Sequence, residues 1–347
     1  MRSSTLPSER IVPEGPWGLT LITALVLTAV SAMGAEAFVR ELGYRPSVAD
    51  TRALWSYHRG RVYADDGKSI VLLGASRMQA GVSLEVFRDH YPNYRITQLA
   101  VSATSPLATL KDLADDEEFV GIVLCSLSPS ALQAGVEPDH SQERHVAEYW
   151  EHRRSWNLID RLRLQFIDSR FAIARPQFRL RPQIRQLLMG TESAGPDFMV
   201  TKFDRSQQLD FQKIDIEKQR ARRVGGTVQF FEKYIPDTPD REAWMEAARA
   251  LKPSVEKLRN RGGRVVFIRF PETGEHWRLS ESHYPRTQFW DHLAESAGTP
   301  TIHFRDVPGL AHFECPDTSH LDYRDTDAFT NALIDACVGQ NVLPKPE

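Results

Sequence analysis

The stretch Ser69-Ile-Val-Leu-Leu-Gly-Ala-Ser-Arg-Met-Gln-Ala-Gly81 decides the fold prediction for this chain, because four apolar residues lead directly into three small ones. A short β-rich run without polar alternation is typical of a strand that is buried on both faces. The small residues predict a turn that places Ser76 at the carboxyl end of a central strand, where open α/β sheets bind ligands. The alternative is that Gly74-Ala75-Ser76 only closes the strand and caps a helix at 84–90.

Apolar runs and helical patterns alternate on both sides of that stretch. Further strands are expected at 94–99, 119–124, 264–270 and 300–304, with helices at 84–90, 107–113, 241–261, 287–297 and 323–338 and loops at 271–283 and 306–319. Such β-turn-α alternation is typical of a parallel, doubly wound sheet. The sequence therefore predicts an α/β domain of the flavodoxin-like kind, formed by residues 66–135 and 240–340.

A charged segment at 140–235 interrupts this alternation. Nothing in it alternates like a strand, so we expect a helical insertion or lid. Its spaced aromatic residues predict a small core of its own: Tyr149, Trp150, Trp156, Phe166, Phe171 and Phe178. Between Arg161 and Arg185 seven arginines accompany a single acidic residue. This run is either a solvated helix face or a surface for anionic lipid or polysaccharide.

An uncharged apolar block near the amino terminus is long enough to span a bilayer. We expect a transmembrane anchor at 18–38, a cytoplasmic tail at 1–17 and a juxtamembrane connection at 39–65. A cleaved signal peptide is the alternative, because Ala32-Met-Gly34 and Ala35-Glu-Ala37 resemble small-residue cleavage sites. Both interpretations place the remaining chain outside the cytoplasm, in the periplasm or the extracellular space.

Composition excludes several other classes of protein. A formal net charge of −3 does not suit a dedicated nucleic-acid binder. The chain contains neither Gly-x-Gly-x-x-Gly nor Gly-x-x-x-x-Gly-Lys-Ser/Thr, so we expect no dinucleotide, no nucleoside triphosphate and no other diffusible cofactor. Cys125, Cys315 and Cys337 are too scattered for a disulfide framework and are expected to be buried, although a Cys315–Cys337 pair stays open.

The late loop carries two residues that can serve Ser76. A hydroxyl becomes a good nucleophile when a base takes its proton, and that base works best when a carboxylate orients it. Asp317 and His320 are three residues apart and supply both groups. One alternative is that Asp317 and His320 are solvated polar residues near a helix start. The other is a metal site formed with His312 and Glu314. That spacing matches no metal motif, so we expect no metal.

With Ser76 early and Asp317-Thr-Ser-His320 late, the chain resembles the SGNH/GDSL hydrolase superfamily. The resemblance implies a serine nucleophile, a histidine base and an aspartate that orients it. It also implies backbone donors for the oxyanion, and here these would be the N–H groups of Ser76 and Ala100. The family's usual third-block asparagine is missing, and Ser126 or Ser128 stands in the corresponding stretch.

The anchor and the insertion further resemble the membrane-tethered, exported branch associated with O-acylation of surface polysaccharides. The resemblance implies a serine esterase or O-acyltransferase whose substrate is an acylated polysaccharide or a small ester. The alternative is a non-catalytic scaffold that binds an anionic polymer or a membrane-bound acyltransferase, because the family's oxyanion glycine and asparagine are replaced. The membrane is an expected partner in both cases, and nucleic acid is not.

Overall fold

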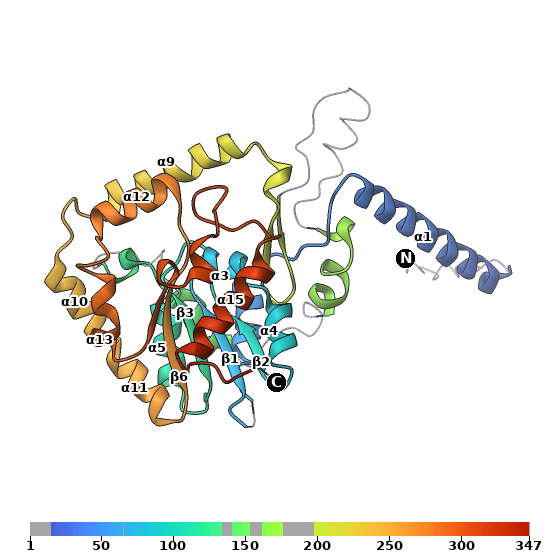
Figure 1. The fold of residues 1–347 in the computed structure, drawn as a ribbon. Coiled ribbons are helices and arrows are strands. Elements are labelled where there is room, and N and C mark those ends of the chain that lie inside the picture. Colours follow the sequence, from blue (N-terminus) through green and yellow to red (C-terminus); the bar gives the residue numbers. More distant parts are fainter. Residues whose placement is uncertain (1–14, 65, 134–140, 153–161, 176–197, 347) are drawn as a thin grey trace, which may run out of the picture.

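The computed structural model describes residues 15–64, 66–133, 141–152, 162–175 and 198–346 (Figure 1). Its central sheet consists of β1 (Ser69–Leu73), β2 (Arg95–Gln98), β3 (Ile122–Ser126), β6 (Arg264–Arg269) and β7 (Thr301–His303). The strands lie in the order β2-β1-β3-β6-β7, and each neighbouring pair is parallel. This is the strand order of flavodoxin-like doubly wound sheets. The predicted α/β fold class is confirmed.

Helices cover both faces of this sheet. On one face lie α2 (Arg52–Arg59), α5 (Leu107–Asp115), α6 (Glu143–His152), α10 (Arg241–Arg249), α11 (Lys252–Asn260) and α13 (Leu293–Ala297). On the other lie α3 (Ser76–Gly81), α4 (Leu84–His90), α14 (Pro308–Ala311) and α15 (Thr326–Gly339). Val71 and Leu73 pack into the first layer, whereas Ile70 and Leu72 pack into the second. Burial on both faces explains why β1 is uniformly apolar.

Helix and loop predictions in the second half of the chain needed correction, including the loop at 306–319, which contains α14. The helix expected at 241–261 divides into α10 and α11, with Pro253 in the first turn of α11, where its missing N–H costs no hydrogen bond. The loop expected at 271–283 is wrong, because α12 (Gly274–His283) occupies most of it. The proline before this helix and the glycine at its start favour a loop in the sequence, and the short buried face of the helix leaves no clear apolar periodicity.

The segment between the two halves of the sheet is not purely helical. Strands β4 (Met199–Thr201) and β5 (Gln207–Leu209) form an antiparallel hairpin, and α9 (Ile216–Tyr234) follows it. The expectation of no strand here was wrong, because three-residue strands are too short to show alternation.

The aromatic residues of this segment do not form the separate core that we expected. Tyr149 packs into the main core, whereas Trp150, Phe166 and Phe171 are exposed. Trp156 and Phe178 lie outside the described residues. The segment therefore depends on contacts with the rest of the molecule.

Helix α1 (Trp17–Glu41) projects away from the α/β body (Figure 1). Its apolar window is exposed along its whole length and is long enough to cross a membrane. Most of the expected tail at 1–17 lies outside the described residues. The three cysteines are buried and free, so Cys315 and Cys337 are not joined here.

Candidate active site

Ser76 is the first residue of α3, immediately after β1 and its turn. Gly74 has a φ of 151°, and a Cβ at this position would lie 2.9 Å from both Met78 Cβ and Ser126 Cβ. Only glycine fits this close approach of the β1–α3 turn to β3. The tight turn leaves Ser76 partly exposed at the carboxyl edge of the sheet, where the sequence placed it.

His320 and Asp317 come to Ser76 from the opposite end of the chain. His320 Nε2 lies 2.8 Å from Ser76 Oγ, and His320 Nδ1 lies 2.9 Å from Asp317 Oδ2. Both the imidazole and the carboxylate are buried. The serine, the histidine and the aspartate therefore form a continuous hydrogen-bonded line.

The loop that carries this pair is held by its own backbone. Asp317 Oδ1 accepts hydrogen bonds from the amides of Ser319 and His320, at 3.0 and 2.7 Å. Thr318 has a φ of 72°, in the left-handed region that favours glycine. Its carbonyl accepts from the Thr273 amide at 3.0 Å. This conformation brings the carboxylate and the imidazole to one side of a single turn.

Electrostatics set the protonation states of the pair. Burial alone would raise the pKa of Asp317, but the hydrogen bonds from His320 and Ser319 and the charge of Arg223 hold that pKa well below its usual range. Burial also lowers the pKa of His320, and Arg223 and Arg77 lower it further against the opposing effect of Asp317. Near neutral pH the carboxylate is ionised and the imidazole is neutral. Since a carboxylate only accepts, Nδ1 carries the proton and Nε2 accepts from Ser76.

Two arginines that the sequence did not single out lie close to the hydrogen-bonded serine, histidine and aspartate. Arg77 Nε donates to the Ser319 carbonyl at 3.2 Å, and its guanidinium forms an ion pair with Glu272. Arg223 on α9 places its Nε 3.4 Å from Asp317 Oδ2. These contacts join residues far apart in the chain, so the only signal in the sequence was that Arg77 follows Ser76.

Buried groups behind Arg77 complete a network. Glu272 also pairs with Arg269, with 2.5 Å between Oε2 and Nη2. His276 Nε2 lies 2.8 Å from Arg77 Nη2, and its Nδ1 lies 3.2 Å from Thr227 Oγ1 on α9. Burial and the nearby arginines lower the pKa of His276 to about 4, so this ring is neutral near pH 7. The network connects α3, α9 and α12 beside Ser76.

The oxyanion prediction for Ala100 needs correction. The Ala100 amide donates to Gln98 Oε1 at 3.0 Å and is therefore already engaged. The loop is held by Arg205, whose guanidinium donates to the carbonyls of Gln98 and Ala100 at 3.0 and 2.9 Å. Ser126 lies across the turn from Gly74, with its Cβ close to that glycine.

Ala103 presents a different geometry three residues further on. Its φ is 61°, and it lines the same cavity as Ala75 and Arg77. Among the described residues, none accepts a hydrogen bond from its amide. A backbone N–H without an acceptor at a cavity bordered by Ala75 and Arg77 is a candidate oxyanion donor.

Gln142 fastens this loop to the serine turn. Its Nε2 donates to the Gly74 carbonyl at 3.0 Å and to Thr104 Oγ1 at 3.1 Å, and its Oε1 accepts from Thr109. The side chain is fully buried. The sequence offered no signal for this role, because glutamine in a polar segment is unremarkable.

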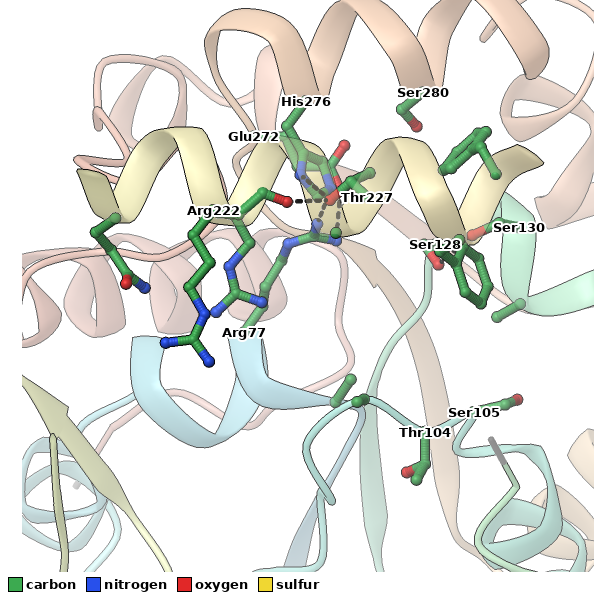
Figure 2. Close-up of a pocket in the computed structure, with 18 of the residues that line it drawn as sticks. Arg77, Thr104, Ser105, Ser128, Ser130, Arg222, Thr227, Glu272, His276 and Ser280 are labelled. Carbon is green, nitrogen blue, oxygen red and sulfur yellow. Dashed lines mark hydrogen bonds and ion pairs between the residues drawn. The ribbon is translucent and has the colours of Figure 1, made fainter. Parts of the chain in front are cut away.

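A cavity of about 730 Å³ opens between α9 and the loops at the carboxyl edge of the sheet (Figure 2). Hydroxyl groups line one side, from Thr104, Ser105, Ser128 and Ser130. Arg222 and Arg223 line another side, and Phe198, Met199 and Phe230 provide apolar surface. Ala75 and Arg77, which flank Ser76, both border this space.

The alternative metal arrangement does not form in the described part of the chain. His312 and Glu314 are exposed, whereas Asp317 and His320 are buried. No group of three or more His, Cys, Asp or Glu residues among the described residues has the arrangement of a metal site.

Fold and site together define an α/β protein with a hydrogen-bonded serine, histidine and aspartate at the carboxyl edge of a flavodoxin-like sheet. No protein-family model and no curated protein matches the sequence. Among solved structures, the chain is similar to one described as "Crystal Structure of TesA". The TM-score is 0.33 and the identity 10%, with 79% of this chain and 99% of that chain covered.

Proposed function

We propose that the protein is a serine esterase or O-acyltransferase acting on an acylated glycan or a related envelope polymer. The observation that carries this proposal is the hydrogen-bonded line from Ser76 Oγ through His320 to Asp317. Each group has the protonation state that its role requires. The nucleophile is a neutral hydroxyl, the base is a neutral imidazole, and the carboxylate is ionised.

In the proposed reaction, Ser76 Oγ attacks the acyl carbonyl while His320 Nε2 takes the hydroxyl proton. Asp317 keeps Nδ1 protonated and stabilises the imidazolium that forms. His320 then gives its proton to the departing alcohol oxygen, and the acyl group stays on Ser76. Water or an acceptor hydroxyl next attacks the acyl carbon while His320 takes its proton, the bond to Ser76 Oγ breaks, and His320 returns the proton to Ser76 Oγ. Water gives hydrolysis, and an acceptor hydroxyl gives transfer.

The oxyanion formed in both steps needs hydrogen-bond donors. We assign this role to the backbone amides of Ser76 and Ala103. Ser76 opens α3, so its N–H has no partner within the helix. Ala103 borders the cavity and carries a free amide among the described residues. Ser126 stays a candidate third donor because its side chain lies beside the Gly74 turn.

The lining of the cavity supports a hydroxyl-rich substrate. Four serine and threonine side chains line the cavity (Figure 2), and Phe198 and Phe230 are also among its lining residues. A sugar ring presents hydroxyl edges and C–H faces, which match a wall of hydroxyls and a wall of aromatic rings. The cavity therefore suits a sugar ester better than a long acyl chain.

The proposal is tested on the full-length protein in detergent with a fluorophosphonate probe and with p-nitrophenyl acetate. The wild type should be labelled on one serine and should release p-nitrophenol. Ser76→Ala should abolish both signals, and His320→Ala should reduce both by about 10³-fold or more. Ser282→Ala, which removes an exposed hydroxyl on α12, is the matched control and should behave like the wild type. Undiminished labelling of Ser76→Ala would contradict the proposal.

A non-catalytic function in binding an anionic polymer is the second candidate. The observation in its favour is Arg222, which lines the cavity from α9 (Figure 2). No described residue forms an ion pair or hydrogen bond with this guanidinium. A free arginine at a hydroxyl-lined cavity suits a carboxylate on a sugar ring.

This second candidate is separated from the first by binding measurements on Ser76→Ala. An acidic oligosaccharide such as oligogalacturonate should bind that variant, and Arg222→Glu should weaken the binding at least tenfold. Arg249→Glu, an exposed position on α10, should have no effect. Binding without any turnover by the wild type would favour the scaffold function, whereas turnover would favour the enzyme.

A further inference from the structure

An apolar patch lies on a short segment that packs beside α1. The segment includes a π-helical turn, η3 (Arg163–Asp168), and a 3₁₀ turn, η4 (Ala172–Ala174). The exposed fractions of Phe166, Ile167 and Phe171 are 44%, 49% and 45%. Large apolar side chains exposed next to one another mark a surface that binds something.

This segment is joined directly to the carboxyl end of α1. The Glu36 carboxylate accepts hydrogen bonds from the amides of Ala172 and Ile173, at 2.9 and 3.0 Å. Arg40 Nη2 donates to the Arg170 carbonyl at 2.8 Å. Ala172 is also buried against Val39. These contacts fix the patch at the level of Glu36 on the helix, and Figure 1 shows the segment beside that end of α1.

The position of Glu36 gives the patch a depth relative to a bilayer. Residues 18–35 of α1 carry no charge, and Glu36 is the first ionisable residue after them. At ~1.5 Å per residue this uncharged run spans about 27 Å. The hydrocarbon core of a bilayer is about 30 Å thick. If α1 crosses the bilayer, Glu36 lies at its edge, and the segment lies there too.

The charges on the segment suit the same location. Arg163 lies 3.5 Å from Asp168, measured from Nε to Oδ1, and 63% of its side chain stays accessible. The Arg170 guanidinium lies 5.2 Å from the centre of the Phe166 ring. Arginines beside apolar side chains are the composition of segments that lie in the interface, where the cations meet lipid phosphates and the apolar groups enter the acyl boundary.

We propose that residues 162–174 lie in the membrane interface and hold the α/β domain against the bilayer that α1 crosses. The inference rests on α1 as a membrane span and is independent of the catalytic proposal. A single helix leaves a domain free to rotate about its tether. A second contact fixes the orientation of the domain, and with it the height of its cavity above the lipid surface.

The test uses the full chain in nanodiscs of phosphatidylcholine and phosphatidylglycerol. Single cysteines at Phe166→Cys and Ile167→Cys are labelled with an environment-sensitive fluorophore, while the three native cysteines are buried. Leu25→Cys on α1 is the control inside the bilayer, and Arg259→Cys on α11 is the control in water, since that side chain is 55% accessible.

Labels at 166 and 167 should emit at shorter wavelength than the label at 259 and should be quenched by lipids with a doxyl group near the headgroup. The label at 25 should be quenched by doxyl groups deep in the acyl chain. Emission at 166 and 167 that matches the label at 259 would overturn the proposal. Shorter-wavelength emission without quenching by lipid would also overturn it, because protein, such as a second copy of the chain, would then cover the patch.

Discussion

His320 is held neutral by its surroundings, and this state is what a base at this position requires. Burial favours the uncharged ring, and Arg223 and Arg77 repel its protonated form, while Asp317 attracts it. The arginines therefore tune the base without touching Ser76 Oγ. Arg223 is the more informative of the two, because Arg77 also holds the loop in place.

Arg223→Gln should move the pH dependence of the proposed esterase. Protonation of His320 removes the base, so activity falls as the pH drops through its pKa, which lies below the ordinary value of 6.5. Removing the positive charge raises this pKa, and the acid limb of kcat/KM should move to higher pH. The pH profile with p-nitrophenyl acetate measures it. Arg223→Lys keeps the charge and should retain the wild-type limb; an unmoved limb in Arg223→Gln would contradict this account.

Gly74→Ala should be strongly disruptive although it adds a single methyl group. The new Cβ would lie 2.9 Å from Met78 Cβ and Ser126 Cβ, and the φ of 151° is unsuited to alanine. We expect a loss of about 1–3 kcal/mol in the free energy of unfolding, measured by urea denaturation. Gly339→Ala meets nothing within 4 Å and is the matched control. Equal stability of the two variants would show that the turn is more tolerant than its geometry indicates.

At the scale of elements, one buried arginine joins α2 to α5. Arg59 Nε lies 2.6 Å from Asp112 Oδ2, and Arg59 Nη2 lies 2.7 Å from Asp116 Oδ2. All three side chains are buried. Burial opposes ionisation of Asp116, but hydrogen bonds from Tyr63 and Arg59 outweigh it and lower the pKa of this carboxyl.

Arg59→Met should cost about 3–5 kcal/mol of stability, because it leaves two buried carboxylates without their cation. The sign of the pH effect follows from the lowered pKa of Asp116. Its contribution is present above the unfolded-state pKa of about 4 and is lost as the pH falls through the folded-state pKa. Urea denaturation at several pH values should therefore show that the free energies of unfolding of the wild type and Arg59→Met differ less in acid than at pH 7. A constant difference would exclude this ion pair as its origin.

Helix α9 forms one wall of the cavity and contains two adjacent glycines in its interior, Gly225 and Gly226. A Cβ at Gly225 would meet nothing within 4 Å, so alanine fits there without strain. Gly225→Ala should stabilise the helix by about 0.5–1 kcal/mol. Hydrogen exchange of the peptides covering 216–234 should become slower. Unchanged exchange would mean that contacts outside the helix, such as that of Arg223 with Asp317, limit its opening.

At the scale of the whole molecule, the chain divides into a projecting apolar helix and a folded α/β body (Figure 1). The body carries the serine, histidine and aspartate at one edge of its sheet, and α1 contacts the segment 162–174 through Glu36. Export of the body is a proposal, and the flanking charges do not decide it, because Arg2 and Arg10 precede the apolar block whereas Arg40, Arg45 and Arg52 follow it.

An alkaline phosphatase reporter fused after Glu347 in a Gram-negative host tests this orientation. The reporter folds only in an oxidising compartment, so the fusion should be active and should sediment with membranes. Leu21→Arg together with Leu25→Arg places two charges in the apolar block and should abolish both properties. Leu21→Ile together with Leu25→Ile is the matched control. An inactive reporter on membrane-bound protein would place the body in the cytoplasm.

The sequence by itself was enough to predict the α/β fold and to name Ser76, Asp317 and His320. Strands buried on both faces are uniformly apolar, and the aspartate and histidine are three residues apart, so both signals are local. Only the tertiary structure decided that the Ala100 amide is engaged, because it donates to Gln98 Oε1. It likewise decided that Arg77 and Arg223 place positive charge at the site, because their contacts join residues that are far apart in sequence. Local sequence patterns indicate which residues are buried and how they are spaced, whereas long-range packing decides which polar groups contact one another.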